Sequence, residues 1–196
     1  MGKNRLEAFS DGVLAIVITI MVLELKVVHD SNFEALKAII PTFLSYVLSF
    51  IYIGIYWNNH HHMLHTMKKI SGPILWANLN LLFWLSLVPF TTAWMGENNF
   101  APAPVAVYGV VLLMAAISYY ILQQLIITSH GKDSLLKKAV GNDLKGKLSP
   151  LFYVTAILLS FWFELISLGI YVLAAVIWLV PDKRIERVFA NDNKVK

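Results

Sequence analysis

Long stretches without any charged residue or histidine are the feature that most limits how this chain can fold. Six of them follow one another: Gly12–Leu23, Ala38–Asn59, Ile70–Gly96, Asn98–Ser129, Leu148–Phe163 and Leu165–Pro181. A helix needs about 20 mainly apolar residues to cross the hydrocarbon core of a bilayer. Of the 196 residues, 58% are hydrophobic and 14% charged, which is more apolar and less charged than a soluble domain requires. The sequence therefore predicts an all-α, polytopic membrane protein.

The stretches predict six transmembrane helices in a single domain that covers residues 1–196. The expected spans are approximately residues 6–26, 37–60, 70–95, 102–129, 147–163 and 165–181. The last two are short and are separated by Glu164 alone, so we expect a tight helical hairpin there. One continuous helix over Leu148–Pro181 is the alternative, but at a rise of 1.5 Å per residue it would be about 50 Å long. A bilayer's hydrocarbon core is only about 30 Å thick.

The basic residues predict the orientation of the chain. Two of the 16 Lys and Arg residues, Lys26 and Lys37, fall on one side of a six-span topology. The others fall on the opposite side: Lys3, Arg5, Lys68, Lys69, Lys132, Lys137, Lys138, Lys145, Lys147, Lys183, Arg184, Arg187, Lys194 and Lys196. Because cytoplasmic loops carry an excess of Lys and Arg, this asymmetry predicts a multi-pass protein of the cell membrane with both termini in the cytoplasm.

Several functional classes lack support in the sequence. The absence of cysteine excludes disulfides and thiolate metal sites. We find no glycine pattern typical of nucleotide binding and no nucleic-acid-binding motif, and the connectors are too short for a separate soluble domain. We therefore expect neither an enzyme, nor a bound cofactor, nor a nucleic-acid partner.

The first span is unusual because its uncharged part is too short. Gly12–Leu23 would extend about 18 Å as a helix, against about 30 Å of hydrocarbon. Asp11, Glu24 or both must therefore lie near or within the apolar layer, where a carboxylate is costly and needs a partner. An N-cap role for Asp11 is the alternative, although Leu6 and Phe9 continue the helical pattern upstream of it.

A helical period of 100° per residue separates this span into two faces. One face is a nearly continuous aliphatic stripe with Thr19 at its edge, formed by Arg5, Phe9, Ile16, Ile20 and Leu23. Asp11 lies on the opposite face with Leu14, Ile18 and Leu25. The stripe by itself is also compatible with ordinary packing against other helices or lipid.

The pattern R-x-x-x-F-S-D, from Arg5 to Asp11, is followed by Gly12–Ile16 and resembles the opening helix of the transmembrane-protein-175 family of potassium channels. The likeness extends to Tyr56–His61, Trp76 and Asn78, and so covers roughly the first half of the chain. A chain with one six-span unit is then expected to form a homotetramer in the lipid bilayer, with the first helix of each copy lining a pore for K⁺ and other monovalent cations.

The resemblance also implies roles for individual residues. The pore constriction would be aliphatic, formed by Ile16, Ile20 and Leu23 with Thr19 as a polar layer, rather than by a T-V-G-Y-G carbonyl filter, which the sequence lacks. A structural network of polar side chains would join the first three helices. Its expected members are Arg5, Ser10, Asp11, His61, Trp76 and Asn78.

Two other interpretations remain open at this point. Asp11 could couple ions or protons in a secondary transporter, although the internal repeats common in transporters are not evident. His61 and His65 lie four residues apart and are weak candidates for binding a metal, but no acidic residue or cysteine lies nearby in the sequence. A membrane-embedded enzyme that uses these histidines ranks last. The sequence thus favours a potassium-selective channel with an aliphatic gate.

Overall fold

The computed structural model describes residues 2–67, 69–131, 134–141 and 144–179. Within these residues every regular element is a helix, so the all-α prediction is confirmed. Residues 180 and 181 of the last predicted span lie outside the described part. The C-terminal basic residues from Lys183 to Lys196, and Lys68 and Lys132, lie outside it as well.

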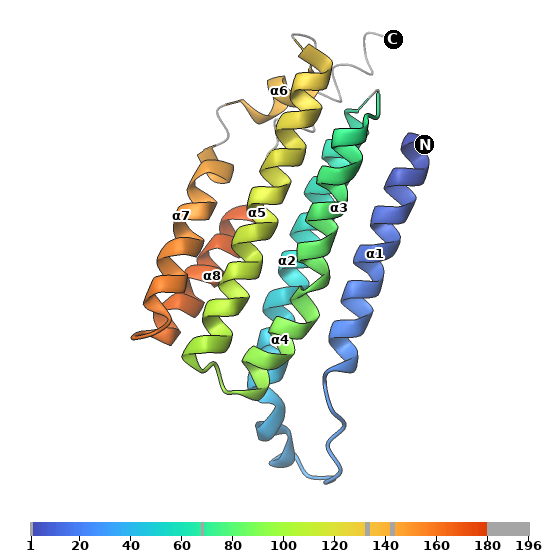
Figure 1. Cartoon of the computed structure of the whole chain (residues 1–196). Coiled ribbons are helices and arrows are strands. Elements are labelled where there is room, and N and C mark those ends of the chain that lie inside the picture. The colour runs from blue at the N-terminus through green and yellow to red at the C-terminus, as the bar shows by residue number, and fades with distance from the viewer. Residues whose placement is uncertain (1, 68, 132–133, 142–143, 180–196) are drawn as a thin grey trace.

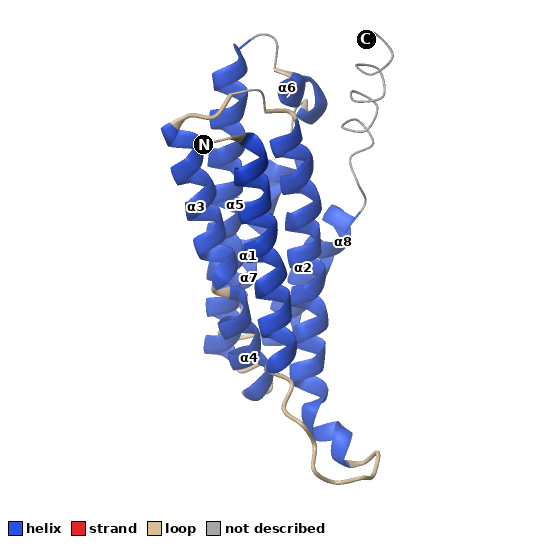
Figure 2. Cartoon of the chain, turned by 90° about the vertical axis from the view of Figure 1, so that its right-hand side faces the viewer, coloured by secondary structure: helices blue, strands red, loops and turns tan. Residues whose placement is uncertain are grey.

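The helices form a bundle whose long members run side by side (Figures 1 and 2). They are α1 (Lys3–Leu23), the 3₁₀ helix η1 (Ala35–Ile39), α2 (Ile40–His65), α3 (Gly72–Ser86), α4 (Val88–Glu97), α5 (Pro102–His130), α6 (Leu135–Val140), α7 (Leu144–Leu159) and α8 (Glu164–Leu179). With α3 and α4 taken as one pass, the described residues make six passes along the bundle. The short helices η1 and α6 lie at its two ends (Figure 1).

The third pass, predicted over residues 70–95, is one apolar segment, Gly72–Glu97, with an interruption inside it. It is divided into α3 and α4 at Leu87, and Pro89 lies in the first turn of α4. Proline has no backbone N–H to donate, and its ring clashes with the preceding turn, so it interrupts a helix but is tolerated at the start of one. Pro41 likewise lies in the first turn of α2, directly after η1.

Four segments are long and apolar enough to cross a membrane by length and composition: α1, η1 with α2, α3 with α4, and α5. In the described part of the chain, α7 and α8 have 16 residues each, fewer than the roughly 20 that a full span needs. They are two separate helices rather than one long one, with α7 ending at Leu159 and α8 beginning at Glu164.

Close contacts between tyrosine and small residues hold the last two helices against α2 and α5. The Tyr52 hydroxyl donates a hydrogen bond to the Tyr171 carbonyl oxygen at 2.6 Å. The Tyr171 hydroxyl donates to the Val105 carbonyl at 3.2 Å. The same hydroxyl lies only 2.0 Å from the position that a Cβ on Gly109 would occupy. Helix α1, in contrast, packs mainly on α2, α3 and α4 and stands at the edge of the bundle away from α7 (Figure 1).

A candidate pore-lining helix and its supports

Helix α1 has one face buried in the bundle. Its buried residues, all at most 3% exposed, are Leu6, Ser10, Leu14, Val17 and Met21. Their spacing of three or four residues keeps them on one side of an α-helix. This face anchors α1 on α2, α3 and α4.

The opposite face of α1 is exposed over its whole length. The exposed fractions are 49% for Phe9, 57% for Ile16, 42% for Ile20 and 79% for Leu23. Thr19 is also exposed, and its hydroxyl donates to the Ile16 carbonyl at 2.9 Å, which leaves the hydroxyl oxygen able to accept. The predicted aliphatic stripe therefore lies on a surface that a single chain leaves uncovered.

An apolar groove runs beside this stripe, between α1 and α4. Ile16 and Ile20 line it from α1, and Pro89, Phe90 and Trp94 line it from α4. Phe90 is 62% exposed, and its ring stacks on Trp94 with a centroid separation of 6.0 Å. Contiguous exposed apolar surface of this kind is typical of protein–protein or protein–lipid contacts.

A buried chain of hydrogen bonds joins α1, α3 and α2 beneath this face. His60 Nε2 donates to Asn78 Oδ1 at 2.7 Å, Asn78 Nδ2 donates to Ser10 Oγ at 3.0 Å, and Ser10 Oγ donates to the Leu6 carbonyl at 2.9 Å. All three side chains are at most 1% exposed. These hydrogen bonds fix the positions of three helices relative to one another, because lipid tails offer no replacement partners.

The structure brings only part of the predicted polar network together. Ser10 and Asn78 meet as expected, but their partner on α2 is His60 and not His61, which is exposed. Trp76, which is 74% exposed, and Arg5 are both exposed rather than buried with this cluster. The buried positions of α2 include Ser45, Ser49, Tyr52, Tyr56 and His60. Because these follow a helical period, the signal for His60 was present in the sequence.

Asp11 accepts a hydrogen bond from a residue outside the predicted network. Trp57 Nε1 donates to Asp11 Oδ1 at 3.1 Å, and the Trp57 ring stacks on His61 at a centroid separation of 6.3 Å. Asp11 lies eight residues after the first residue of α1, so the N-cap alternative is wrong. His61 also stacks on His65 at 6.2 Å, and no group of three potential metal ligands occurs among the described residues.

The far end of α1 carries charged groups of both signs. Glu24 follows Leu23 and lines both the α1–α4 groove and a second hollow beside Lys26 and Glu97. Lys26 Nζ donates a hydrogen bond to the Glu97 carboxylate, and this bond raises the pKa of Lys26 above its ordinary value. Lys26 therefore stays charged and offsets Glu97, whereas the Glu24 carboxylate is exposed beside this pair.

Comparison with known proteins agrees with this architecture. A chain from Chryseobacterium sp. (strain P1-3) named as a potassium channel is 58% identical over 187 residues, which cover 95% of this chain and 97% of that relative. The profile of the family described as endosomal/lysosomal potassium channel TMEM175 matches residues 5–89. The chain belongs to the TMEM175 family.

A solved relative of this TMEM175 chain extends the match to the fold. The crystal structure of a lysosomal potassium-selective channel TMEM175 homolog from Chamaesiphon minutus superimposes with a TM-score of 0.78 at 30% identity, covering 92% of this chain and 97% of that one. The human endosomal/lysosomal proton channel TMEM175 is 38% identical over 96 residues, which are 42% of this chain and 19% of the human protein. The TMEM175 family is a family of multi-pass membrane channels and not of enzymes.

Proposed function

We propose that the chain is a potassium-selective cation channel that works as a homotetramer with α1 lining the pore. The observation that carries the proposal is the exposed aliphatic face of α1, which stands opposite a fully buried face of the same helix. The Chryseobacterium relative and the crystallised Chamaesiphon homolog are both named as potassium channels, which supports the choice of ion.

One copy of the chain cannot enclose a pore with one stripe on one helix. A ring of identical copies around a rotation axis closes such a pore, since each copy presents the same surface to the axis. The groove between α1 and α4 then accommodates part of the next copy, which buries Phe90 and Trp94. Four copies bring Ile16, Ile20 and Leu23 into successive aliphatic rings.

Such rings conduct in a different way from a carbonyl-lined filter. Aliphatic side chains offer no oxygen to replace an ion's water shell, so a narrow ring excludes water and closes by dewetting. When the ring widens, an ion that loses water more easily passes at lower cost, which favours K⁺ over Na⁺. The exposed Thr19 hydroxyls add weak oxygen ligands between the rings.

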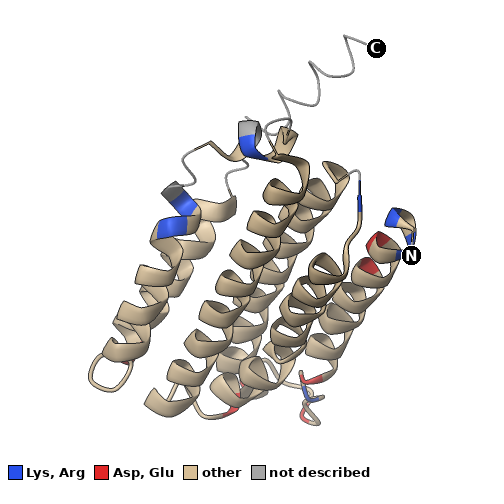
Figure 3. Ribbon diagram, turned by 45° about the horizontal axis from the view of Figure 1, so that its top comes forward, with Lys and Arg blue, Asp and Glu red and all other residues tan. Residues whose placement is uncertain are grey.

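Both termini are placed in the cytoplasm in this proposal. The described Lys and Arg residues gather mainly at the end of the bundle where α1 begins, around α6 and the start of α7, with a smaller mixed group at the other end (Figure 3). An excess of basic residues marks the cytoplasmic side of a membrane protein. Glu24 and Glu97 then lie at the external mouth of the pore.

The direct test is reconstitution in liposomes that hold a potassium gradient. A channel gives a K⁺ flux that needs no counter-substrate and drives the membrane to the Nernst potential for K⁺. A fixed ratio of protons moved per K⁺ would instead establish a coupled transporter, the alternative for which Asp11 is the candidate carboxylate. Native mass measurement of the same sample gives the number of copies, and a value other than four contradicts the tetramer.

A local test separates the pore assignment from general effects on the membrane protein. Ile16→Asn places a polar group in an aliphatic ring, so it is expected to raise conductance severalfold and weaken the preference for K⁺ over Na⁺. Leu23→Ala widens the last ring and is expected to raise conductance. Leu173→Ala, on the exposed face of α8, is the matched control and should leave both properties unchanged. If neither α1 variant changes conductance or the preference for K⁺ over Na⁺, the stripe does not line the pore.

A further inference from the structure

Two neighbouring residues of α1 hold this helix to two different helices. Ser10 Oγ accepts a hydrogen bond from Asn78 of α3 at 3.0 Å. Asp11 Oδ1 accepts one from Trp57 Nε1 of α2 at 3.1 Å. Consecutive side chains on an α-helix point about 100° apart, so α1 is held from two directions. One such bond would let α1 turn about it, whereas the two together fix the rotation of α1 about its own axis.

The rest of the buried face of α1 gives that rotation no directional support. Apart from Ser10 it is apolar, formed by Leu6, Leu14, Val17 and Met21. Contacts between apolar side chains are not directional. In a membrane the lipid tails are as apolar as these side chains, so hydrophobic burial does not drive helices together. The two hydrogen bonds therefore supply the directional part of the contact.

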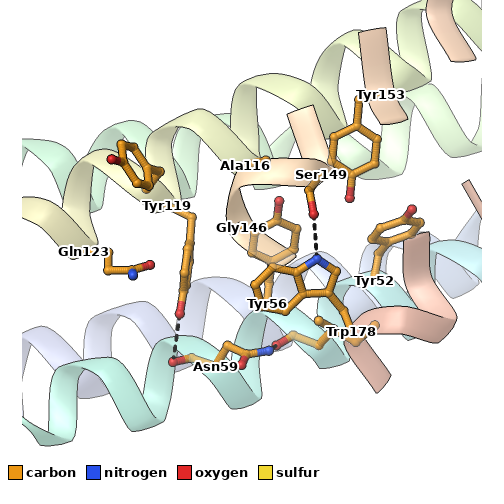
Figure 4. A pocket seen from close by; sticks show the side chains of 12 residues that line it. Tyr52, Tyr56, Asn59, Ala116, Tyr119, Gln123, Gly146, Ser149, Tyr153 and Trp178 are labelled. Atoms are coloured by element: carbon orange, nitrogen blue, oxygen red, sulfur yellow. Dashed lines mark hydrogen bonds between the residues drawn. The ribbon is translucent and has the colours of Figure 1, made fainter. Parts of the chain in front are cut away.

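Helix α2 is held independently of α1 and gives Trp57 a fixed base. Nearly opposite Trp57 on this helix, at 100° per residue, Tyr52 and Asn59 line a small pocket shared with α5, α7 and α8 (Figure 4). The Tyr52 hydroxyl donates to the Tyr171 carbonyl at 2.6 Å. The Tyr119 hydroxyl donates to the Asn59 carbonyl at 3.4 Å. Loss of the bond to Asp11 therefore frees α1 and leaves α2 in place.

The indole ring of Trp57 is 47% exposed and is held by stacking on other rings. It stacks on His61 with a centroid separation of 6.3 Å, and His61 stacks on His65 at 6.2 Å. Lys3 Nζ donates to the His65 carbonyl oxygen at 2.8 Å, so this column of residues is joined to α1 at both ends. The two joined pairs, Lys3 with His65 and Asp11 with Trp57, are eight residues apart on both helices. This equal spacing is expected of antiparallel helices in one register.

We propose that Trp57 is a positioning residue for ion conduction: through Asp11 it sets the rotation of α1 and so decides which side chains of α1 face the ion path. This role rests on the proposed pore, and Trp57 itself contacts no permeant ion. Without the indole N–H, α1 turns about the bond between Ser10 and Asn78. The preference for K⁺ over Na⁺ then falls, because the width of the pore at Ile16 is no longer set by one kind of side chain.

The first test removes only the donor, since Trp57→Phe keeps an aromatic ring beside His61. Selectivity is measured from the reversal potential in planar bilayers with K⁺ on one side and Na⁺ on the other. It is expected to fall about threefold, the change in population that one average hydrogen bond between membrane helices contributes. Trp162→Phe, exposed between α7 and α8, is the matched control and should leave the reversal potential unchanged. An unchanged reversal potential in Trp57→Phe would overturn the proposal.

Variants of Asp11 separate the hydrogen bond from other effects. Asp11→Asn keeps a side-chain oxygen that accepts from Trp57, so it should retain the selectivity. Asp11→Leu removes the acceptor and should match Trp57→Phe, and the double variant should be no worse than either single one because both remove the same bond. A merely structural role predicts less folded protein in Asp11→Leu but the same selectivity in the remaining channels, which would contradict the proposal. Loss of selectivity in Asp11→Asn would show that the charge acts and not the bond.

The rotation of α1 can also be measured without ion flux. The chain has no cysteine, so the thiol introduced by Ile16→Cys or Val17→Cys is its only one. Ile16 is 57% exposed and Val17 is 3% exposed, so the two thiols should react with a maleimide in detergent at widely different rates. In the Trp57→Phe background the two rates should approach each other. An unchanged ratio of rates would refute the role of Trp57, whereas absence of K⁺ flux in the unaltered chain would contradict the pore and leave this measurement valid.

Discussion

At the scale of single residues, hydrogen-bond partners decide which polar side chains stabilise the bundle. Asn78 is placed so that both ends of its amide are used, one by His60 and the other by Ser10. A polar group that loses its partner in a buried place costs about 1–3 kcal/mol, and bonds between membrane helices contribute on average about 0.6 kcal/mol. His60 should therefore support stability measurably and His61 should not.

We accordingly expect His60→Ala to lower the stability of the protein by about 1 kcal/mol, because Asn78 Oδ1 loses its donor. The measurement is the midpoint of thermal unfolding in detergent. His61→Ala, in the neighbouring exposed position, is the matched control and should leave the midpoint within error. If His61→Ala lowers the midpoint and His60→Ala does not, the network member is His61, the residue expected from the sequence.

A second residue-scale prediction concerns Gly109. A side-chain carbon at this position would meet the Tyr171 hydroxyl at 2.0 Å and Ile157 at 2.7 Å, so these side chains, or the helices that carry them, would have to shift. Overpacking of this kind costs about 1–3 kcal/mol. Gly109→Ala should therefore lower the unfolding midpoint, whereas Gly169→Ala, with open space around it, should not. Equal midpoints for the two variants would mean that Tyr171 can withdraw from the gap without cost.

At the scale of elements, periodicity in α1 predicted more than any other feature of the sequence. Assigning residues to faces at 100° each placed Phe9, Ile16, Ile20 and Leu23 together, and the structure leaves all four exposed on one side. It did not identify Trp57 as the partner of Asp11, because a contact between two helices depends on their relative height and rotation, which no pattern within one helix contains. The break at Leu87 was likewise missed as a boundary, although Pro89 signalled it.

The end of α1 gives an element-scale prediction for conduction. In the proposed tetramer four Glu24 carboxylates would stand around the external mouth, where they would raise the local concentration of cations. Glu24→Gln should lower K⁺ conductance about twofold or more at 0.01 M salt, where the screening length is about 30 Å, and have little effect at 1 M, where it is about 3 Å. Single-channel recording in planar bilayers at both concentrations measures this.

The control for Glu24 is a carboxylate of the same charge in the same connecting segment. Glu34 directly precedes η1, pairs with Lys37 at 2.7 Å and follows the end of α1 by more residues than Glu24 does. Glu34→Gln should change conductance less than Glu24→Gln at low salt. If the two variants behave alike, the effect comes from net charge at this end and not from a ring at the pore mouth.

At the scale of the whole molecule, the two sides of the bundle are built for different neighbours. The side of α1 and α4 presents an apolar face beside an open groove, which suits another protein surface, whereas α7 and α8 expose scattered apolar side chains such as Leu158, Leu165 and Val176, which suit lipid. The all-helical, apolar character was predictable from the uncharged stretches alone. The division into two sides was not, because it depends on which helices pack in the centre.

This division predicts which surface substitution breaks the assembly. Phe90→Asp places a charge in the α1–α4 groove, where a neighbouring copy would bury it, and a buried unpaired charge costs several kcal/mol. The proposed tetramer should therefore dissociate into smaller species in native mass spectra. Leu173→Asp puts the same charge on the exposed face of α8, outside the proposed contact between copies, and should leave four copies together in the same detergent. If Leu173→Asp dissociates the assembly and Phe90→Asp does not, the contact between copies lies on α8. The assignment of α1 to the pore axis would then be wrong.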